Sequence, residues 1–264
     1  MRKIAEGEVW NRDANSRTNE KTYYSASENA LLKADSEDWI RLVDEYLDVP
    51  NKQQWLSENS SKTFPFMHMP LVLQMLGERS GELKVEGKIM GHVVRKSHPG
   101  MDYELLKQLP KAIADPLMII HSDDSKKYKV VVKLVDNNGA TIIATVQIDY
   151  RNKDGIIVGD IMTSAFGKTQ RQGKTVPDIR WFIDRIEANQ IEYINKQKSI
   201  AWFEGDGSDR AVIPQNIKDA LINSIISVDE AKVKTEKDLI DMREKHPTQY
   251  SLSSAIDKGL NKTS

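Results

Sequence analysis

The sequence predicts an α+β fold in which helices flank an antiparallel meander of strands. Two observations carry this prediction. Short apolar runs separated by turn residues are typical of antiparallel strands. Apolar residues at three- and four-residue spacing, before and after these runs, indicate amphipathic helices. The strand runs are Leu117–His121, Lys129–Val135, Thr141–Tyr150 and Ile156–Ala165.

Two turn sequences join the later strands of this sheet, and a helix and two short strands are predicted to follow them. Residues 137–139 read Asn-Asn-Gly and residues 153–155 read Lys-Asp-Gly, and Asn and Gly accept positive φ at little cost. Consecutive strands joined by such turns form an antiparallel meander. Helical spacing follows at Asp178–Asn189, and Ile191–Ile194 and Ile200–Phe203 are predicted as two short final strands.

The region before the meander is expected to be mostly helical. Ser36 precedes apolar residues at helical spacing, which predicts an N-cap there and a helix that ends at Pro50. The first dense apolar block begins at Phe64, and Pro70 is suited to open a short helix. A strand is predicted at Glu82–Ile89, followed by a loop and by a helix through Leu109.

These patterns divide the chain into four expected segments. They are a flexible arm (residues 1–33), a helix with a linker (34–63), the functional domain (64–204), and a helical appendage with a mobile end (205–264).

Composition excludes several classes of protein. The chain has 264 residues and no cysteine, so it has neither a disulfide framework nor a thiolate metal site. No apolar run approaches the roughly 20 residues that cross a bilayer, so we expect no membrane partner and a cytoplasmic protein, with virion association or delivery to a target cell as alternatives. The formal net charge of -1 means that any site for a polyanion must be local.

The common enzyme motifs are missing from the sequence. It contains no GxxxxGK[ST] loop, no GxGxxG segment, no HExxH helix and no GxSxG elbow. We therefore expect no nucleotide, dinucleotide or metal cofactor.

Five phrases in the middle of the chain carry a family resemblance. They are FPFMHMPLVLQMLG, SHPGMDYELLKQLPKAIADPLMIIHS, KVVVKLVDNNGATIIATVQI, GDIMTSAFGK and IEYINKQKSIAW. Together they resemble the C-terminal domain of phage MuF-type proteins, over about residues 64–202, a module grouped with barnase/EndoU/colicin/RelE-like nucleases. The resemblance implies a ribonuclease-like fold, in which N-terminal helices pack on a four- to five-stranded antiparallel sheet with a cleft on the sheet face. It also implies a toxin or effector activity.

The resemblance also implies the site residues. It assigns His98 before the LPxxIxDP helix, Ser164 at a strand end with Lys168 nearby, and Tyr193 on a late strand that is followed by Lys196 and Lys198. One departure is visible, because Gly159-Asp160 stands where the family pattern has Asn or a similar polar residue.

These residue types suit metal-free RNA cleavage. His98 is the expected acid or base, because the pKa of an unperturbed imidazole lies near working pH. Hydroxyl groups of Ser164 and Tyr193 could donate hydrogen bonds to phosphate oxygens, and lysines could stabilise the negative charge. The loop from Phe166 to Lys174 is locally basic and could follow a phosphate backbone. The expected phosphate-binding residues are Lys168, Arg171, Lys174, Lys196 and Lys198.

Two functional hypotheses follow. The first is a phage- or prophage-associated ribonuclease-like effector that binds RNA and has an immunity protein or phage head or portal proteins as partners. The second is a non-catalytic phage structural or protein-interaction module that keeps the fold. Singly, each site residue also has a structural interpretation: His98 as a cap, Ser164 as a turn residue and Tyr193 as core. Trp181 and Trp202 are assigned to the core.

Overall fold

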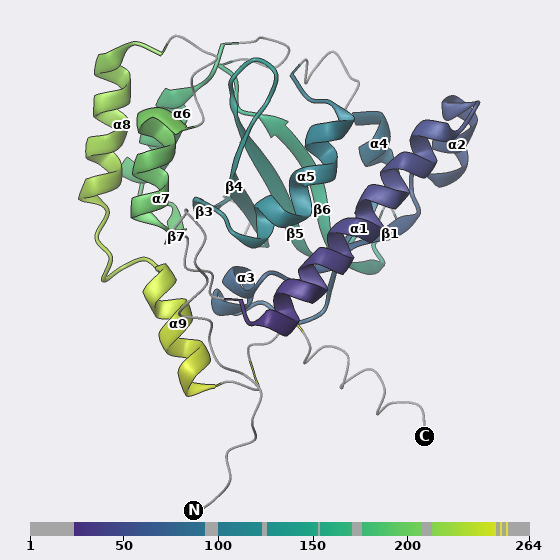
Figure 1. Cartoon of the computed structure of the whole chain (residues 1–264), viewed down its shortest axis with the longest axis horizontal. Helices are drawn as coiled ribbons and strands as arrows, with labels where there is room; N and C mark the ends of the chain where they lie inside the picture. Colours follow the sequence, from purple (N-terminus) through teal and green to yellow (C-terminus); the bar gives the residue numbers. More distant parts are fainter. Residues whose placement is uncertain are drawn as a thin grey trace, which may run out of the picture.

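The structure is a computed structural model that describes residues 24–92, 100–122, 126–152, 154–170, 176–206 and 213–246, together with residues 249 and 252. Helices precede, interrupt and follow the strands along the chain, and the strands join in a single mixed sheet (Figure 1). The elements are α1 (Ala26–Asp48), α2 (Lys52–Asn59), β1 (Thr63–His68), α3 (Leu71–Met75), β2 (Glu82–Glu86), α4 (Lys88–His92), α5 (Tyr103–Ala114), β3 (Met118–His121), β4 (Lys127–Val135), β5 (Thr141–Arg151), β6 (Ile157–Gly167), α6 (Ile179–Glu187), β7 (Ile191–Ile194), α7 (Lys196–Ala201), the π-helical turn η1 (Trp202–Asp206), α8 (Gln215–Ser227) and α9 (Glu236–Lys245).

The sheet has seven strands in the order β1-β2-β6-β5-β4-β3-β7. Every neighbouring pair is antiparallel except β2 and β6, which run parallel. The α+β class is therefore confirmed, but the expected four- to five-stranded antiparallel sheet is not. The difference arises because β1 and β2, from the N-terminal half of the chain, extend the meander along the free edge of β6.

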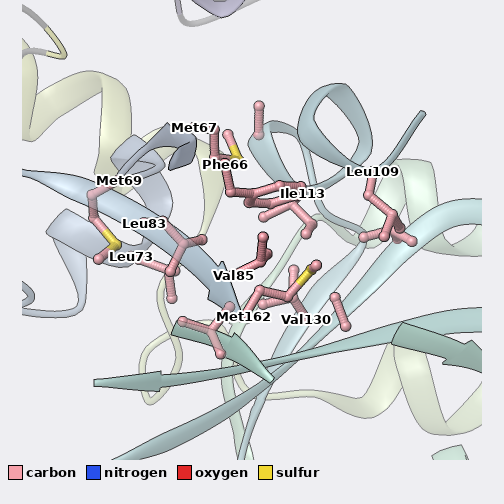
Figure 2. Packing of buried hydrophobic residues seen from close by; sticks show 14 of the residues in the cluster. Phe66, Met67, Met69, Leu73, Leu83, Val85, Leu109, Ile113, Val130 and Met162 are labelled. Carbon is pink, nitrogen blue, oxygen red and sulfur yellow. The ribbon is translucent and has the colours of Figure 1, made fainter. Parts of the chain in front are cut away.

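Helices cover both faces of the sheet, and the sheet separates two cores. The first core lies under α1 and α5, and Figure 2 shows Phe66, Val85, Leu109 and Met162 converging within it. The second core lies under α6 and α8 and contains Phe182. Figure 1 shows α1 and α5 crossing in front of the strands, with α6, α7 and α8 together at the left.

The N-terminal helix is longer than predicted. Helix α1 begins at Ala26, because Ser25 and Glu28 form a capping box in which each side chain accepts a hydrogen bond from the backbone N–H of the other. Ser36 is therefore a buried residue within the helix, and its hydroxyl donates to the carbonyl of Leu32 rather than capping an end. The linker expected after Pro50 instead contains α2, capped by Asn51.

Helix α5 contains a proline, and a side chain of α1 replaces the hydrogen bond that the proline cannot make. Pro110 lies inside the helix, where it has no N–H to donate to the carbonyl four residues earlier, that of Leu106. The indole nitrogen of Trp39 in α1 donates to this carbonyl at 2.8 Å. Packing of α1 on α5 therefore satisfies the group that the proline leaves without its helical partner.

The end of the predicted domain is helical rather than extended. Residues Ile200–Phe203 were predicted as a strand, but they belong to α7 and η1. Asn195 caps α7, since its Oδ1 accepts from the backbone N–H of Lys198 at 3.0 Å. Among the helices of the described ranges, none is long and apolar enough to cross a membrane.

Candidate functional site

One face of the sheet carries polar side chains where no core cluster covers it. Lys129 of β4 is the Cα partner of Thr145 of β5, which is in turn the partner of Ser164 of β6. Partners on adjacent strands project their side chains to the same face, and these three side chains are half-buried. They therefore form one polar row across three strands.

A second row lies beside the first. Lys127 of β4 is the partner of Gln147 of β5, which is the partner of Ile161 of β6. Because strand residues alternate between faces with a period of two, this row shares the face of the first. We call this surface the polar sheet face and define it by Lys127, Lys129, Thr145, Gln147 and Ser164.

An aromatic ring with cations around it borders the polar sheet face. The Nζ atoms of Lys129 and Lys168 lie 5.5 Å and 5.3 Å from the ring centroid of Trp181, and the guanidinium carbon of Arg185 lies 5.7 Å from it. These distances are within the range of cation–π attraction. The ring thus gathers positive charge from β4, the end of β6 and α6, beside the row that ends in Ser164.

The ammonium group of Lys168 is also held by an acid. Its Nζ lies 2.9 Å from Oδ2 of Asp178, and the side chains are only 19% and 18% exposed. Asp178 caps α6 through its other oxygen, which accepts from the backbone N–H of Trp181 at 3.2 Å. The pair ties the end of β6 to the start of α6, so Lys168 has a structural role in addition to its predicted one.

Tyr193 lies away from Ser164. It is fully buried in the first core, on the opposite face of the sheet from Ser164, and burial raises the pKa of its phenol above the usual value. Three strands separate β7 from β6, which at about 4.8 Å per step puts the two strands roughly 19 Å apart. The structure therefore does not bring Tyr193 and Ser164 into one pocket.

The two late lysines are on α7 rather than on a strand, and both form ion pairs. Nζ of Lys196 lies 3.3 Å from Oε1 of Glu230 and donates a hydrogen bond to the carbonyl of Ile226. Lys198 lies 2.8 Å from Asp115, with its side chain 15% exposed. Like Tyr193, they are positioned by the β7 edge of the sheet, apart from the polar sheet face.

Three predicted site residues lie outside the described residues: His98, Arg171 and Lys174. The structure therefore neither places them nor tests their predicted roles.

The departure at Asp160 does not change the charge of the polar sheet face. Asp160 is the partner of Leu83, a residue of the first core, so its side chain lies on the other face from Ser164. Its Oδ1 accepts from the backbone N–H of Asp149 at 2.9 Å. Asp149 has a positive φ of 48°, so the carboxylate stabilises an irregular turn of β5.

A buried carboxylate anchors the end of β6 beside Lys168. Asp136 is 2% exposed and its Oδ1 accepts from the backbone N–H groups of Asn138 and Ala140. A Cβ atom on Gly100 or on Gly167 would overlap the carboxylate of Asp136. Both glycines are therefore required for close packing, and Asp136 brings the segments that contain them together.

The sequence contained signals for some of the features that the prediction missed. Asn195 is a good N-cap residue, and this signal favours α7 over a strand. The Ser25/Glu28 pair has the spacing of a capping box and marks the start of α1. Trp181 was assigned to the core, and it packs against the second core while staying half-buried. Its cationic neighbours come from three elements, and no local pattern shows that arrangement.

Comparison with known proteins identifies the central region. Residues 92–201 match the family model described as the phage MuF-C-terminal domain. The predicted resemblance is thus confirmed, over a shorter range than expected, from the end of α4 to the end of α7. No curated protein matches the chain, and no solved structure matches it. Within the described ranges, no group of three or more His, Asp or Glu side chains could hold a metal ion.

Proposed function

We propose that this chain is a phage-associated, ribonuclease-like effector that binds RNA on the polar sheet face and cleaves it without a metal ion. The observation that carries the proposal is the row formed by Lys129, Thr145 and Ser164, with the cations around Trp181 at its border. Hydroxyl and ammonium groups on one half-exposed face suit phosphate oxygens, and the match to a phage domain supports the phage context.

The proposed site uses Ser164 and Lys168 together with His98. Gly100 packs on Asp136, which also packs on Gly167, the residue before Lys168. The resemblance assigns the proton transfers of this site to His98, which lies outside the described residues. Tyr193, Lys196 and Lys198 are not used, because they lie at the β7 edge.

A cleavage assay tests the proposal. Purified protein is incubated with several RNA types in EDTA, and the products are separated on denaturing gels. Wild type is expected to degrade RNA, His98→Ala to abolish degradation, and Ser164→Ala to slow it by about 10- to 100-fold. Ser57→Ala, which changes an exposed hydroxyl that donates to the carbonyl of Gln54, is the matched control. Intact RNA at high doses of wild type contradicts the proposal.

Binding is tested separately from cleavage. Lys129→Gln is expected to weaken RNA binding in fluorescence polarisation and to reduce the slope of log affinity against log salt concentration by about 1. Lys232→Gln removes an equally long cation from an exposed position and should leave the slope unchanged. Equal slopes for both variants would exclude the polar sheet face as the RNA site.

A second function is favoured because three of the predicted phosphate-binding lysines already form ion pairs. Lys168, Lys196 and Lys198 each form an ion pair with an acid, so their charges are already partly balanced. This arrangement suits a non-catalytic phage module that binds a head or portal protein. It predicts that cells tolerate high expression of the chain, and that His98→Ala captures the same phage proteins as wild type.

A further inference from the structure

A second cluster of titratable groups lies on the sheet, outside the residues considered above. Glu86 ends β2, and its side chain is only 8% exposed. Its Oε2 forms an ion pair with Nζ of Lys88 and lies 3.4 Å from the hydroxyl of Tyr150. The Lys88 Nζ also lies 5.7 Å from the ring centroid of Tyr150. A carboxylate, an ammonium and a phenol from β2, α4 and β5 thus converge.

This cluster shares the face of Ser164. Val85 and Met162 are Cα partners on the parallel strands β2 and β6, and both belong to the first core. The next residue of β2, Glu86, therefore points to the opposite face. Met162 and Ser164 also point to opposite faces, because their partners Val146 and Thr145 are consecutive in β5. Glu86 therefore lies on the same face as Ser164, on the neighbouring strand, and adjacent strands lie about 4.8 Å apart.

The Lys88 ammonium stays charged in this setting. Burial lowers the pKa of Lys88, but the hydrogen bond and charge of Glu86 outweigh burial, and the pKa is raised above its ordinary value. The side chain of Lys88 is 37% exposed, so the ammonium can be reached from solvent. The cluster therefore offers a proton acceptor and a permanent positive charge beside the hydroxyl row.

We propose that Glu86 is the general base of the RNA cleavage proposed above, and that Lys88 stabilises the negative charge of the phosphorane. The 2′-hydroxyl proton passes to Glu86 as the 2′-oxygen bonds to phosphorus and the bond between phosphorus and the 5′-oxygen breaks. The departing 5′-oxygen takes a proton from the acid of the proposed function, and the proton on Glu86 returns to that acid through water. The products are a 2′,3′-cyclic phosphate and a 5′-hydroxyl end. This inference rests on the proposed function.

The experiment compares two glutamates of β2. Glu86→Gln keeps the size and hydrogen bonding of the side chain and removes its basicity. Glu82→Gln is the matched control, because Glu82 lies on the same strand and face, four residues away, and its side chain is 45% exposed. A short RNA and its DNA counterpart are incubated with each protein in EDTA, and kcat, KM and cyclic phosphate are measured between about pH 4 and pH 9.

The expected results separate a catalytic role from a structural one. Glu86→Gln should lower kcat by about 10²- to 10⁴-fold and leave KM within about twofold. Glu82→Gln should match wild type, and DNA should remain intact because it has no 2′-hydroxyl. Cleavage by Glu86→Gln at the wild-type rate would overturn the role of Glu86 and leave the proposed function standing. Absence of cleavage by wild type would overturn both.

A second variant decides the matter if Glu86→Gln does not fold, as judged by circular dichroism. Glu86→Asp keeps the negative charge beside Lys88 but withdraws the carboxylate by one methylene. A misplaced base should cost about tenfold or more in kcat while the melting temperature stays within a few degrees. An unchanged kcat for Glu86→Asp would refute the assignment.

Discussion

Nη2 of Arg243 in α9 lies 2.7 Å from Oε2 of Glu28 in α1, and the two side chains are 7% and 2% exposed. The pair joins residues that are 215 positions apart in the chain. Oε1 of the same glutamate accepts from the backbone N–H of Leu252. The C-terminal helix is thereby joined to the start of the first long helix through a buried charge.

Breaking this pair should be costly. Arg243→Met leaves the Glu28 carboxylate buried without its cation, and loss of one partner of a buried pair typically costs about 3–5 kcal/mol in the free energy of unfolding. Urea denaturation followed by circular dichroism measures the change. Lys33→Met, which removes an exposed helical pair with Glu37, should cost under about 0.5 kcal/mol. Equal effects for the two variants would show that the buried pair contributes no more to stability than the exposed pair does.

The hydrogen bond between α1 and the proline-containing helix α5 should also contribute to the stability of the protein. Trp39→Phe keeps an aromatic ring near Phe66, whose centroid lies 4.9 Å away, but removes the donor to the carbonyl of Leu106. A buried carbonyl left without a partner costs about 1–3 kcal/mol. In the background Pro110→Ala, which restores a helical N–H, the same substitution should cost less. A double-mutant cycle in urea measures the coupling, and additive effects would argue against it.

Stability should depend on pH through His68. Oδ1 of Asp35 lies 2.9 Å from Nδ1 of His68, and this hydrogen bond, opposed by burial, raises the pKa of the imidazole above its ordinary value. The stabilisation is therefore fully present below about pH 6.5, the ordinary value, and is lost as pH rises through the raised pKa. The stability difference between wild type and His68→Gln should be larger at about pH 5.5 than at about pH 8.5. In a protein that carries Asp35→Asn, the effect of His68→Gln on stability should be the same at about pH 5.5 and at about pH 8.5.

Gly167 should not tolerate a side chain. Gly167→Ala places a methyl group on the carboxylate of Asp136, and such overpacking costs about 1–3 kcal/mol. Asp136→Ala should relieve the overlap, so the double variant should be less affected by the alanine at 167 than wild type is. Gly81→Ala, where a Cβ atom has nothing within 4 Å, is the control. Thermal unfolding is measured for wild type, the two single variants, the double variant and this control. A wild-type melting temperature for Gly167→Ala would contradict the close packing.

Local patterns were sufficient for the strands of the meander. Thr141–Tyr150 was predicted and β5 spans Thr141–Arg151, because alternating apolar residues and a glycine turn act over a few neighbours. Gly139 has the expected positive φ of 79°. The start of α1 was missed because the polar residues before Ser36 have no apolar stripe, although α1 packs on α5 through Trp39. The position of β2 beside β6 was also missed, because a parallel pair between distant segments leaves no local signal.

The residues of the candidate site, too, were predicted only in part from the sequence. The sequence identified Ser164 and Lys168. The structure places Ser164 in the row of Lys129 and Lys168 next to the ring of Trp181. The sequence also grouped Tyr193 with Ser164, but spacing along the chain does not show which face of a sheet a side chain occupies. A shift of one residue in register reverses every face. Glu86 was missed because its partners Lys88 and Tyr150 come together only through the order of the strands.

The sequence by itself determined the α+β class, most of the strands and the resemblance of the central region to a phage domain, since each depends on residues close together in the chain. Only the tertiary structure decided that the sheet is mixed, that Ser164 and Tyr193 lie on opposite faces, and that Glu86 lies on the same face as Ser164. The physical reason is that strand order and register depend on which distant apolar surfaces pack together, and these select the side chains that meet.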